Sequence, residues 1–219
     1  MKFKGVIFDL DGTLVNSLED IADSMNNVLR KYGFPAHELQ AYKHFIGNGM
    51  NNLVYEVLPE AYREEELITR CFDLMKEEYR NNCTNKTQPY DGIGELLNEL
   101  TARKMKLAVL SNKVDDLTKK VVMTLLPNWN FEVVIGVSAE IPRKPNPLGA
   151  LLISRKLGIH PENLIYVGDT GVDMQAANSA GAYAVGALWG FRPKEELTAA
   201  DAKYLLNYPL ELIQLLEKS

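Results

Sequence analysis

The residues Gly5-Val6-Ile7-Phe8-Asp9-Leu10-Asp11-Gly12-Thr13 give the clearest indication of the architecture of this chain. The first four of these residues form a short apolar run, typical of a β-strand that is covered on both faces of a sheet. Asp9 and Asp11 follow this run directly, and both would project to the same side if the strand conformation continued. Gly12 allows the chain to turn sharply after the two acids. The stretch therefore predicts a buried strand that ends in a pair of carboxylates.

Further apolar runs repeat this pattern later in the chain. They lie at 106–110, 133–135, 164–167 and, more weakly, 183–185. Residues with helical spacing separate them, such as Leu117, Val121 and Val122 after the second run. Alternating strands and helices predict the α/β class, with a Rossmann-like, doubly wound parallel sheet and right-handed crossovers.

Residues 16–87 break this alternation, because they contain helical patterns and no convincing strand. In their second half, four residues recur at every fourth position: Leu67, Cys71, Met75 and Tyr79. Ser17 and Asp20 predict a capping box at the start of the first helix. We therefore expect a small all-helical cap at 16–87, inserted after the first strand of a catalytic core formed by 1–15 and 88–219. The two ends of the insert should lie close together and act as hinges.

The composition is that of a globular protein: of 219 residues, 46% are apolar and 24% charged. The formal net charge is −5 and no basic stripe stands out, so we expect no nucleic-acid partner. No run approaches the roughly 18 apolar residues of a membrane span, and no signal peptide is recognisable, so we expect no membrane partner. Two cysteines, Cys71 and Cys83, are too few for a disulfide framework, which favours a cytoplasmic location.

Polar residues also follow the later strands. Three segments are involved: Ser111-Asn112-Lys113, Arg143-Lys144-Pro145 and Gly168-Asp169-Thr170-Gly171-Val172-Asp173. Ligands of such sheets bind beyond the carboxyl ends of the strands. We therefore expect carboxylates, a hydroxyl group and a lysine to converge on one edge of the sheet.

This set of residues permits attack on phosphorus. The carboxylate of Asp9 could form an acyl phosphate, provided that a divalent cation and a lysine offset its repulsion from the phosphate. Asp9 and Asp169 offer the hard oxygen ligands that Mg²⁺ prefers. Lys144 could neutralise the phosphate, and the Ser111 hydroxyl could hold its oxygens. Asp11 could protonate the leaving oxygen and later activate water.

These segments, in this order, resemble the motifs of the haloacid dehalogenase superfamily over the whole chain. The matching motifs are Asp9-Leu10-Asp11-Gly12-Thr13, Ser111-Asn112, Lys144-Pro145-Asn146-Pro147, and Gly168-Asp169-Thr170 with Asp173. The resemblance implies that Asp9 is the nucleophile and a Mg²⁺ ligand. It implies that Asp11 is the general acid/base and gives its backbone carbonyl to the metal, and that Asp169 is a further ligand.

The resemblance also assigns the supporting roles. The implied substrate-binding residues are Gly12, Thr13, Ser111, Asn112 and Lys144. Lys144 would in addition orient Asp9. Asp173, together with Thr170, would support the metal site from outside it or through Lys144.

Within the superfamily, the chain is most similar to phosphoglycolate phosphatases. Its segment Phe45-Ile46-Gly47-Asn48-Gly49-Met50 resembles their glycine-containing specificity loop. The candidate residues of the cap for contact with a substrate carboxylate are Lys43, His44, Gly47 and Asn48. The resemblance implies a Mg²⁺-dependent phosphatase, monomeric or homodimeric, that hydrolyses a small phosphorylated metabolite through an aspartyl phosphate, with 2-phosphoglycolate as the best candidate.

Other interpretations stay open on the sequence. A sugar phosphomutase or a pyrophosphatase of the same superfamily would carry the same motifs, although Thr13 fits hydrolases better than mutases. A phospho-receiver module also clusters Asp, Ser or Thr, and Lys on a doubly wound sheet, but it carries no helical insert. Asp169 could cap the helix that follows it. Lys113 and Arg143 are interpreted as surface residues.

Overall fold

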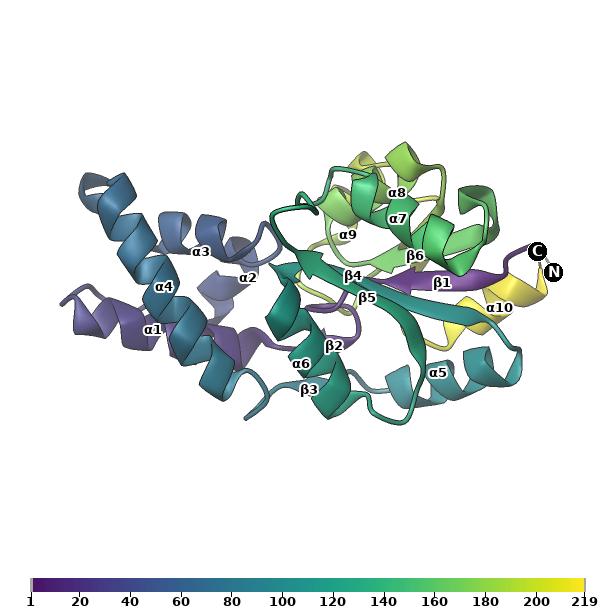
Figure 1. Ribbon diagram of the computed structural model, residues 1–219, viewed down its shortest axis with the longest axis horizontal. Coiled ribbons are helices and arrows are strands. Elements are labelled where there is room, and N and C mark those ends of the chain that lie inside the picture. Colours follow the sequence, from purple (N-terminus) through teal and green to yellow (C-terminus); the bar gives the residue numbers. More distant parts are fainter. Residues whose placement is uncertain (1, 219) are drawn as a thin grey trace.

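A six-stranded parallel sheet forms the centre of the protein in a computed structural model, which describes residues 2–218 (Figure 1). Its strands are β1 (Gly5–Phe8), β4 (Lys106–Val114), β5 (Phe131–Val137), β6 (Leu164–Gly168), β7 (Tyr183–Ala187) and β8 (Tyr204–Leu206). The strand order is β5-β4-β1-β6-β7-β8, so β1 lies between β4 and β6. The predicted α/β class is confirmed, and β8 is a strand that the sequence pattern did not reveal.

Helices cover both faces of this sheet. Those of the core are α5 (Ile93–Ala102), α6 (Asp115–Leu125), α7 (Leu148–Leu157), α8 (Gly171–Ala180), α9 (Lys194–Ala199) and α10 (Glu211–Glu217), with the 3₁₀ turn η3 (Pro161–Asn163). Successive residues of β1 point to opposite faces, as the pleat of a strand requires. Val6 and Phe8 join the apolar cluster that contains residues of α5, α6 and α10. Ile7 joins a second cluster with residues of α7, α8 and α9. Burial on both faces explains why β1 is apolar at every position.

The remaining helices form a separate layer beyond the carboxyl end of β1 (Figure 1, purple to blue). They are α1 (Leu18–Lys31), α2 (Tyr42–Phe45), α3 (Met50–Val57) and α4 (Glu65–Asn82), with the 3₁₀ turns η1 (Leu39–Ala41) and η2 (Glu60–Tyr62). Two short strands, β2 (Val15–Asn16) and β3 (Gln88–Pro89), connect this layer to the core. They pair antiparallel, with Val15 opposite Pro89. The chain therefore leaves the core and rejoins it at one place.

The predicted capping box of the first helix is wrong, because both of its residues have other partners. Ser17 is the residue before α1, but its side chain makes no capping hydrogen bond to the helix. Its hydroxyl donates instead to Oδ1 of Asp11 at 2.6 Å. The carboxylate of Asp20 accepts hydrogen bonds from the backbone N–H groups of Lys86 and Thr87 and from the Thr87 hydroxyl. These bonds fasten α1 to the segment that returns to the core.

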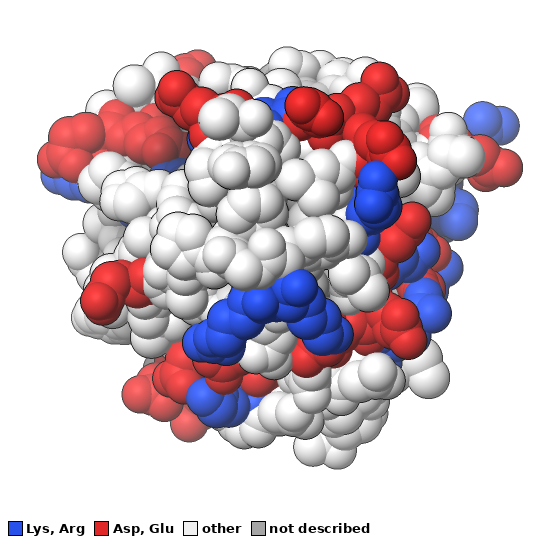
Figure 2. Space-filling model, turned by 90° about the vertical axis from the view of Figure 1, so that its left-hand side faces the viewer, with Lys and Arg blue, Asp and Glu red and all other residues white. Residues whose placement is uncertain are grey.

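The surface of the helical layer carries mixed charge. Figure 2 views this end of the molecule and shows one contiguous arc of basic side chains at the lower centre, with acidic side chains beside it and around the rim. Cys71 and Cys83 are buried and free. Among the helices of residues 2–218, none combines the length and the apolar character needed to cross a membrane.

Candidate active site

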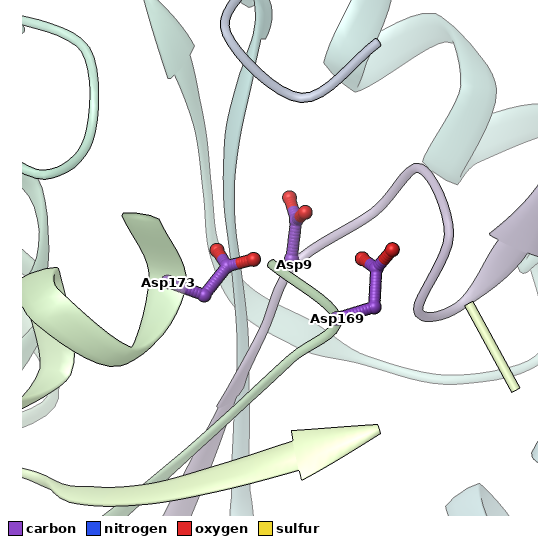
Figure 3. A group of neighbouring side chains, drawn as sticks. All are labelled: Asp9, Asp169 and Asp173. Atoms are coloured by element: carbon purple, nitrogen blue, oxygen red, sulfur yellow. The ribbon is translucent and has the colours of Figure 1, made fainter. Parts of the chain in front are cut away.

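Asp9 stands at the point where β1 ends, and its carboxylate is almost fully enclosed. Its backbone N–H donates to the carbonyl of Val167 on the neighbouring strand at 2.9 Å. Nζ of Lys144 lies 2.8 Å from Asp9 Oδ1 as an ion pair. Asp169 and Asp173 flank Asp9, and Figure 3 shows the three carboxyl groups on the same side of the strand ends. The sequence prediction that these motifs meet at one edge of the sheet is therefore confirmed.

The three carboxylates affect one another electrostatically. Each offers an oxygen within 4.8 Å of the others, and all three residues are buried. Burial raises the pKa of Asp9 well above its ordinary value, and the charge of Asp173 raises it further, while Lys144 opposes the shift. Burial, and then Asp173, raise the pKa of Asp169 to about 7. These raised pKa values come first from burial and second from the neighbouring negative charge, which Lys144 only partly offsets.

A divalent cation fits this cluster. Within residues 2–218, Oδ1 of Asp9 is buried without a hydrogen bond, because Lys144 approaches it without hydrogen-bond geometry. Asp173 is different, since donors from Lys144, Tyr166 and Thr170 occupy both of its oxygens. Hard carboxylate oxygens around a concentrated negative charge are what Mg²⁺ requires. Asp9 and Asp169 are therefore the side chains suited to hold it, and Asp173 is suited to support Lys144.

Asp169 is fixed by the loop after β1. Thr13 Oγ1 donates to Asp169 Oδ1 at 2.9 Å, so the hydroxyl of Thr13, expected to bind substrate, instead orients an acid. Gly12 adopts a φ of +86°, and a Cβ added there would lie 2.3 Å from Asp169 Oδ2. Only glycine combines this backbone conformation with so close an approach. Gly12 therefore shapes the site by having no side chain.

Lys144 is held by residues of three segments. Its Nζ donates to Asp173 Oδ1 at 2.7 Å and to the carbonyl of Leu110 at 3.2 Å. Burial alone would lower the pKa of Lys144, but the charges of Asp173 and Asp9 raise it well above the ordinary value. The ammonium group thus stays charged beside the nucleophile, where it can neutralise a phosphate.

Asn112 ties the site together through its amide group. Its Oδ1 accepts a hydrogen bond from the backbone N–H of Lys144 at 2.7 Å, and its Nδ2 donates to the carbonyl of Gly47 in the cap at 2.9 Å. Ser111 lies beside it, is buried, and lines the same cavity as Asp9. The Ser111 oxygen accepts a hydrogen bond from the backbone N–H of Lys113 at 3.2 Å, which leaves its O–H group to donate to a phosphate, whereas the Asn112 side chain already joins core and cap.

Asp11 has a partner that the sequence analysis did not expect. Nζ of Lys113 lies 2.7 Å from Asp11 Oδ1 and 2.6 Å from the hydroxyl oxygen of Tyr79 on α4. The interpretation of Lys113 as a surface residue is wrong, because its side chain is only 4% exposed. Burial would lower the pKa of Lys113, but the charge of Asp11 and the Tyr79 hydroxyl raise it above its ordinary value. Nothing near Lys113 in the sequence indicates these two partners.

A cavity lies between the acids Asp9 and Asp11 and the helical layer of α1 to α4, which we call the cap. Asp9, Asp11, Ser111 and Lys113 line it from the core, together with Gly47 from the cap loop. Of the cap candidates, Gly47 is thus at the cavity. Asn48 instead lines a second pocket of the core–cap boundary, near Thr170. The side chains of Lys43 and His44 line neither of these two pockets.

Arg192 fastens the cap loop to the core. Its guanidinium group donates to the backbone carbonyls of Lys43, His44 and Ile46, while its Nε pairs with Glu196 at 3.3 Å. Arg143 is exposed, as expected of a surface residue, and it also contacts the cap, because it donates to the carbonyl of Asn48 at 2.7 Å. The loop 43–48 is thus bound to the core through its backbone.

The loop that follows β7 also contributes to the site, although the sequence did not predict it there. The backbone N–H of Phe191 donates to Asp169 Oδ2 at 2.8 Å, and Trp189 Nε1 donates to the Thr13 carbonyl at 2.9 Å. A Cβ on Gly190 would lie 2.3 Å from the Cβ of Asp169. The signal was present, because 183–185 was predicted as a weak strand, and the residues after it reach the same edge of the sheet.

Comparison with known proteins agrees with this geometry. The model of the family "Haloacid dehalogenase-like hydrolase" matches residues 6–187. A phosphoglycolate phosphatase of Aquifex aeolicus is 32% identical over 97% of this chain and 96% of its own length. One from Yersinia pestis is 29% identical over 97% and 94%. The solved structure of a predicted phosphoglycolate phosphatase from Haemophilus somnus superposes with a TM-score of 0.89 at 27% identity, covering 99% of both chains.

Proposed function

The chain belongs to the haloacid dehalogenase-like hydrolase family, and from this premise we propose a Mg²⁺-dependent hydrolysis that passes through a phosphorylated Asp9. The relatives support the coarser statement directly: the chain is a phosphoric monoester hydrolase that acts on small phosphorylated substrates. We take 2-phosphoglycolate as the leading substrate, because the relatives that cover nearly the whole chain carry that activity in their names.

One observation carries the proposal: Asp9 lines the cavity, and the ammonium group of the buried Lys144 lies 2.8 Å from Oδ1 of its carboxylate. A carboxylate that reaches the substrate cavity can supply the oxygen that attacks phosphorus. Lys144, 2.8 Å away, offsets the repulsion between this carboxylate and an anionic phosphate. Both conditions are needed for attack on phosphorus.

In the first step, an oxygen of Asp9 bonds to phosphorus as the bond from phosphorus to the ester oxygen breaks. Asp11, which lines the same cavity, gives its proton to the departing oxygen. The Ser111 hydroxyl and Lys144 hold the oxygens of the phosphoryl group. The products of this step are a free alcohol and an acyl phosphate on Asp9.

In the second step, a water molecule attacks the acyl phosphate, and Asp11 takes the proton that the water loses. The bond between phosphorus and Asp9 breaks, inorganic phosphate departs, and both acids return to their starting states. Mg²⁺, when bound, would neutralise charge on the phosphoryl group. We assign its ligands to Asp9, Asp169 and the backbone carbonyl of Asp11.

The test is phosphate release from a panel of phosphorylated metabolites, including 2-phosphoglycolate, pyrophosphate and a sugar phosphate, ranked by kcat/KM. We expect 2-phosphoglycolate to rank first. Asp9→Asn should abolish turnover, whereas Asp91→Asn, which removes an exposed acid elsewhere, should leave it intact. Full activity of a pure Asp9→Asn protein would rule out the mechanism. Retention of phosphate on the protein until a sugar hydroxyl is added would instead indicate a mutase.

A further inference from the structure

The cavity between the acids and the cap is apolar on its cap side. The cap side chains that line it include Ile21, Ile46, Met50, Leu53 and Met75. The space is small, about 50 Å³, which is room for a few water molecules. Among the residues that line it, Lys113 is the single cation. Among these lining side chains, Lys113 is therefore the one that can attract a negatively charged group of a ligand.

Lys113 has an unused donor. Its ammonium group bonds to Asp11 and to the hydroxyl oxygen of Tyr79, and residues 2–218 provide no third hydrogen bond to it. An ammonium group carries three N–H donors. Because Lys113 lines the cavity, one donor is available to a ligand there.

The position of this donor relates to the leaving group. In the proposed mechanism Asp11 contacts the ester oxygen that departs, and Lys113 Nζ lies 2.7 Å from Asp11 Oδ1. The ammonium group is therefore next to the carbon that bears the departing oxygen. Lys144, in contrast, lies at Asp9, on the side of the phosphoryl group. The two buried lysines thus face opposite ends of a substrate.

We propose that Lys113 binds a carboxylate on the leaving alcohol, one carbon away from the ester oxygen. This subsite selects phosphate esters of small hydroxy acids over uncharged or cationic esters of the same size. The inference rests on the proposed function, because it concerns the alcohol that departs from phosphorus. It replaces the expectation that Lys43 or His44 receives the carboxylate, since neither side chain lines the cavity.

The subsite joins the two parts of the molecule. Lys113 belongs to β4 of the core, and Tyr79 belongs to α4 of the cap. The Tyr79 hydroxyl holds the ammonium group, and the Tyr79 ring also lies below it, with Nζ 4.6 Å from the ring centroid. Lys113 is therefore held in place for a ligand only when α4 lies against the core.

A binding experiment in an Asp11→Asn background tests this role. Removing Lys113 alone would also leave Asp11 without its partner, and because Asp11 lines the same cavity, this change would itself affect ligand binding. The single variant Asp11→Asn and the double variant Asp11→Asn with Lys113→Met avoid this effect. Calorimetry with Mg²⁺ measures the dissociation constants of 2-phosphoglycolate and of its carboxamide analogue, which has the same shape without the carboxylate charge.

We expect the Asp11→Asn protein to bind the carboxylate ester roughly ten- to a hundredfold more tightly than the carboxamide, the worth of one charge-assisted hydrogen bond. The double variant should bind the two esters about equally. As a matched control, Lys120→Met in the Asp11→Asn background removes an exposed lysine that contacts the Arg80 carbonyl on α4. This control should keep the preference.

Two results would overturn the proposal. One is a preference that persists in the double variant, and the other is an Asp11→Asn protein that binds both esters equally. If the double variant does not fold, the wild-type protein provides the test through its kcat/KM for 2-phosphoglycolate and for the carboxamide analogue. Equal kcat/KM values for the two esters would rule out a carboxylate subsite. Failure of the proposed function is distinguishable, because the wild-type protein would then release phosphate from neither ester, while the binding preference is read without turnover.

Discussion

Gly12 and Asp169 are far apart in the sequence but approach so closely that a Cβ on Gly12 would lie 2.3 Å from Asp169 Oδ2. Gly12→Ala should therefore displace the acid and strain the backbone at a positive φ. We expect kcat/KM to fall by about a hundredfold and stability by about 1–3 kcal/mol. Kinetics and denaturant unfolding measure both effects. Gly33→Ala is the control for backbone strain, because Gly33 also has a positive φ but no atom within 4 Å of the added Cβ. An unchanged kcat/KM in Gly12→Ala would contradict the close approach.

Asp11→Asn should separate the two chemical steps. An ester with a good leaving group, such as p-nitrophenyl phosphate, needs little protonation to depart, whereas hydrolysis of the acyl phosphate needs a base for water. We expect a burst of about one nitrophenol per protein molecule followed by turnover slowed by roughly 10²–10⁴-fold. Stopped-flow absorbance measures the burst. A slowed reaction without a burst would mean that Asp11 acts only in the first step.

The activity should depend on the choice of divalent cation. EDTA should stop phosphate release, and added Mg²⁺ should restore it. Ca²⁺ should inhibit, because its looser and larger coordination shell disturbs the alignment of the reacting oxygens. A phosphate assay with each cation at matched ionic strength measures the effect. Full activity of the protein after exhaustive chelation would remove the metal from the proposed mechanism.

Stability should depend on pH and on Mg²⁺ together. The pKa of Asp169, raised to about 7, means that the folded protein holds a proton that the unfolded chain releases near pH 4. Between these values the metal-free folded state binds more protons than the unfolded state, so the free energy of unfolding falls as the pH rises from about 4 to 7. Mg²⁺ requires the ionised carboxylates, so its stabilisation should grow over the same range.

Thermal melts with EDTA and with Mg²⁺ at pH 5 and pH 8 measure this dependence. We expect the shift in Tm caused by Mg²⁺ to be clearly larger at pH 8. Equal shifts at the two pH values would contradict the raised pKa. Asp91→Asn, which changes an exposed acid, should reproduce the wild-type pattern and so excludes a general charge effect.

Arg192 should govern how tightly the cap is held. Arg192→Ala removes the donors to the carbonyls of Lys43, His44 and Ile46. We expect KM to rise by about tenfold and hydrogen exchange to quicken in residues 43–48, because the cap would spend more time open. Arg155→Ala, an exposed arginine of α7, is the control and should change neither quantity. Faster exchange spread over the whole chain would indicate general destabilisation instead.

The sequence sufficed to predict the acids of the site because each of them directly follows a buried strand. Asp9 comes directly after β1 and Asp169 directly after β6, and the carboxyl ends of parallel strands lie at the same edge of the sheet. The helical layer was predictable for a similar reason, since the four-residue spacing that ends at Tyr79 is a local pattern. Both features are determined within a single short segment of the chain, and such features can be predicted from the sequence.

The partners of Lys113 could not be predicted in this way. Lys113 comes just after a buried run and looks like many surface lysines, yet Asp11 and Tyr79 come from distant parts of the chain to enclose it. The same holds for Phe191, whose contribution to the site is its backbone N–H, a group that every residue except proline possesses. Contacts of this kind depend on how separate elements pack together, and they produce no periodic pattern in the sequence from which they could be predicted.

The pairing of β2 with β3 bears on how proteins of this kind diversify. Because Val15 lies opposite Pro89, residues 17–87 begin and end at one point of the core. Because the two ends of the insertion are adjacent, the sheet does not restrict the length of the chain between them. Helices can therefore be gained, lost or exchanged there while β1 stays paired with β4 and β6. Evolution can thus rebuild the part that meets the alcohol and leave the chemistry at phosphorus untouched.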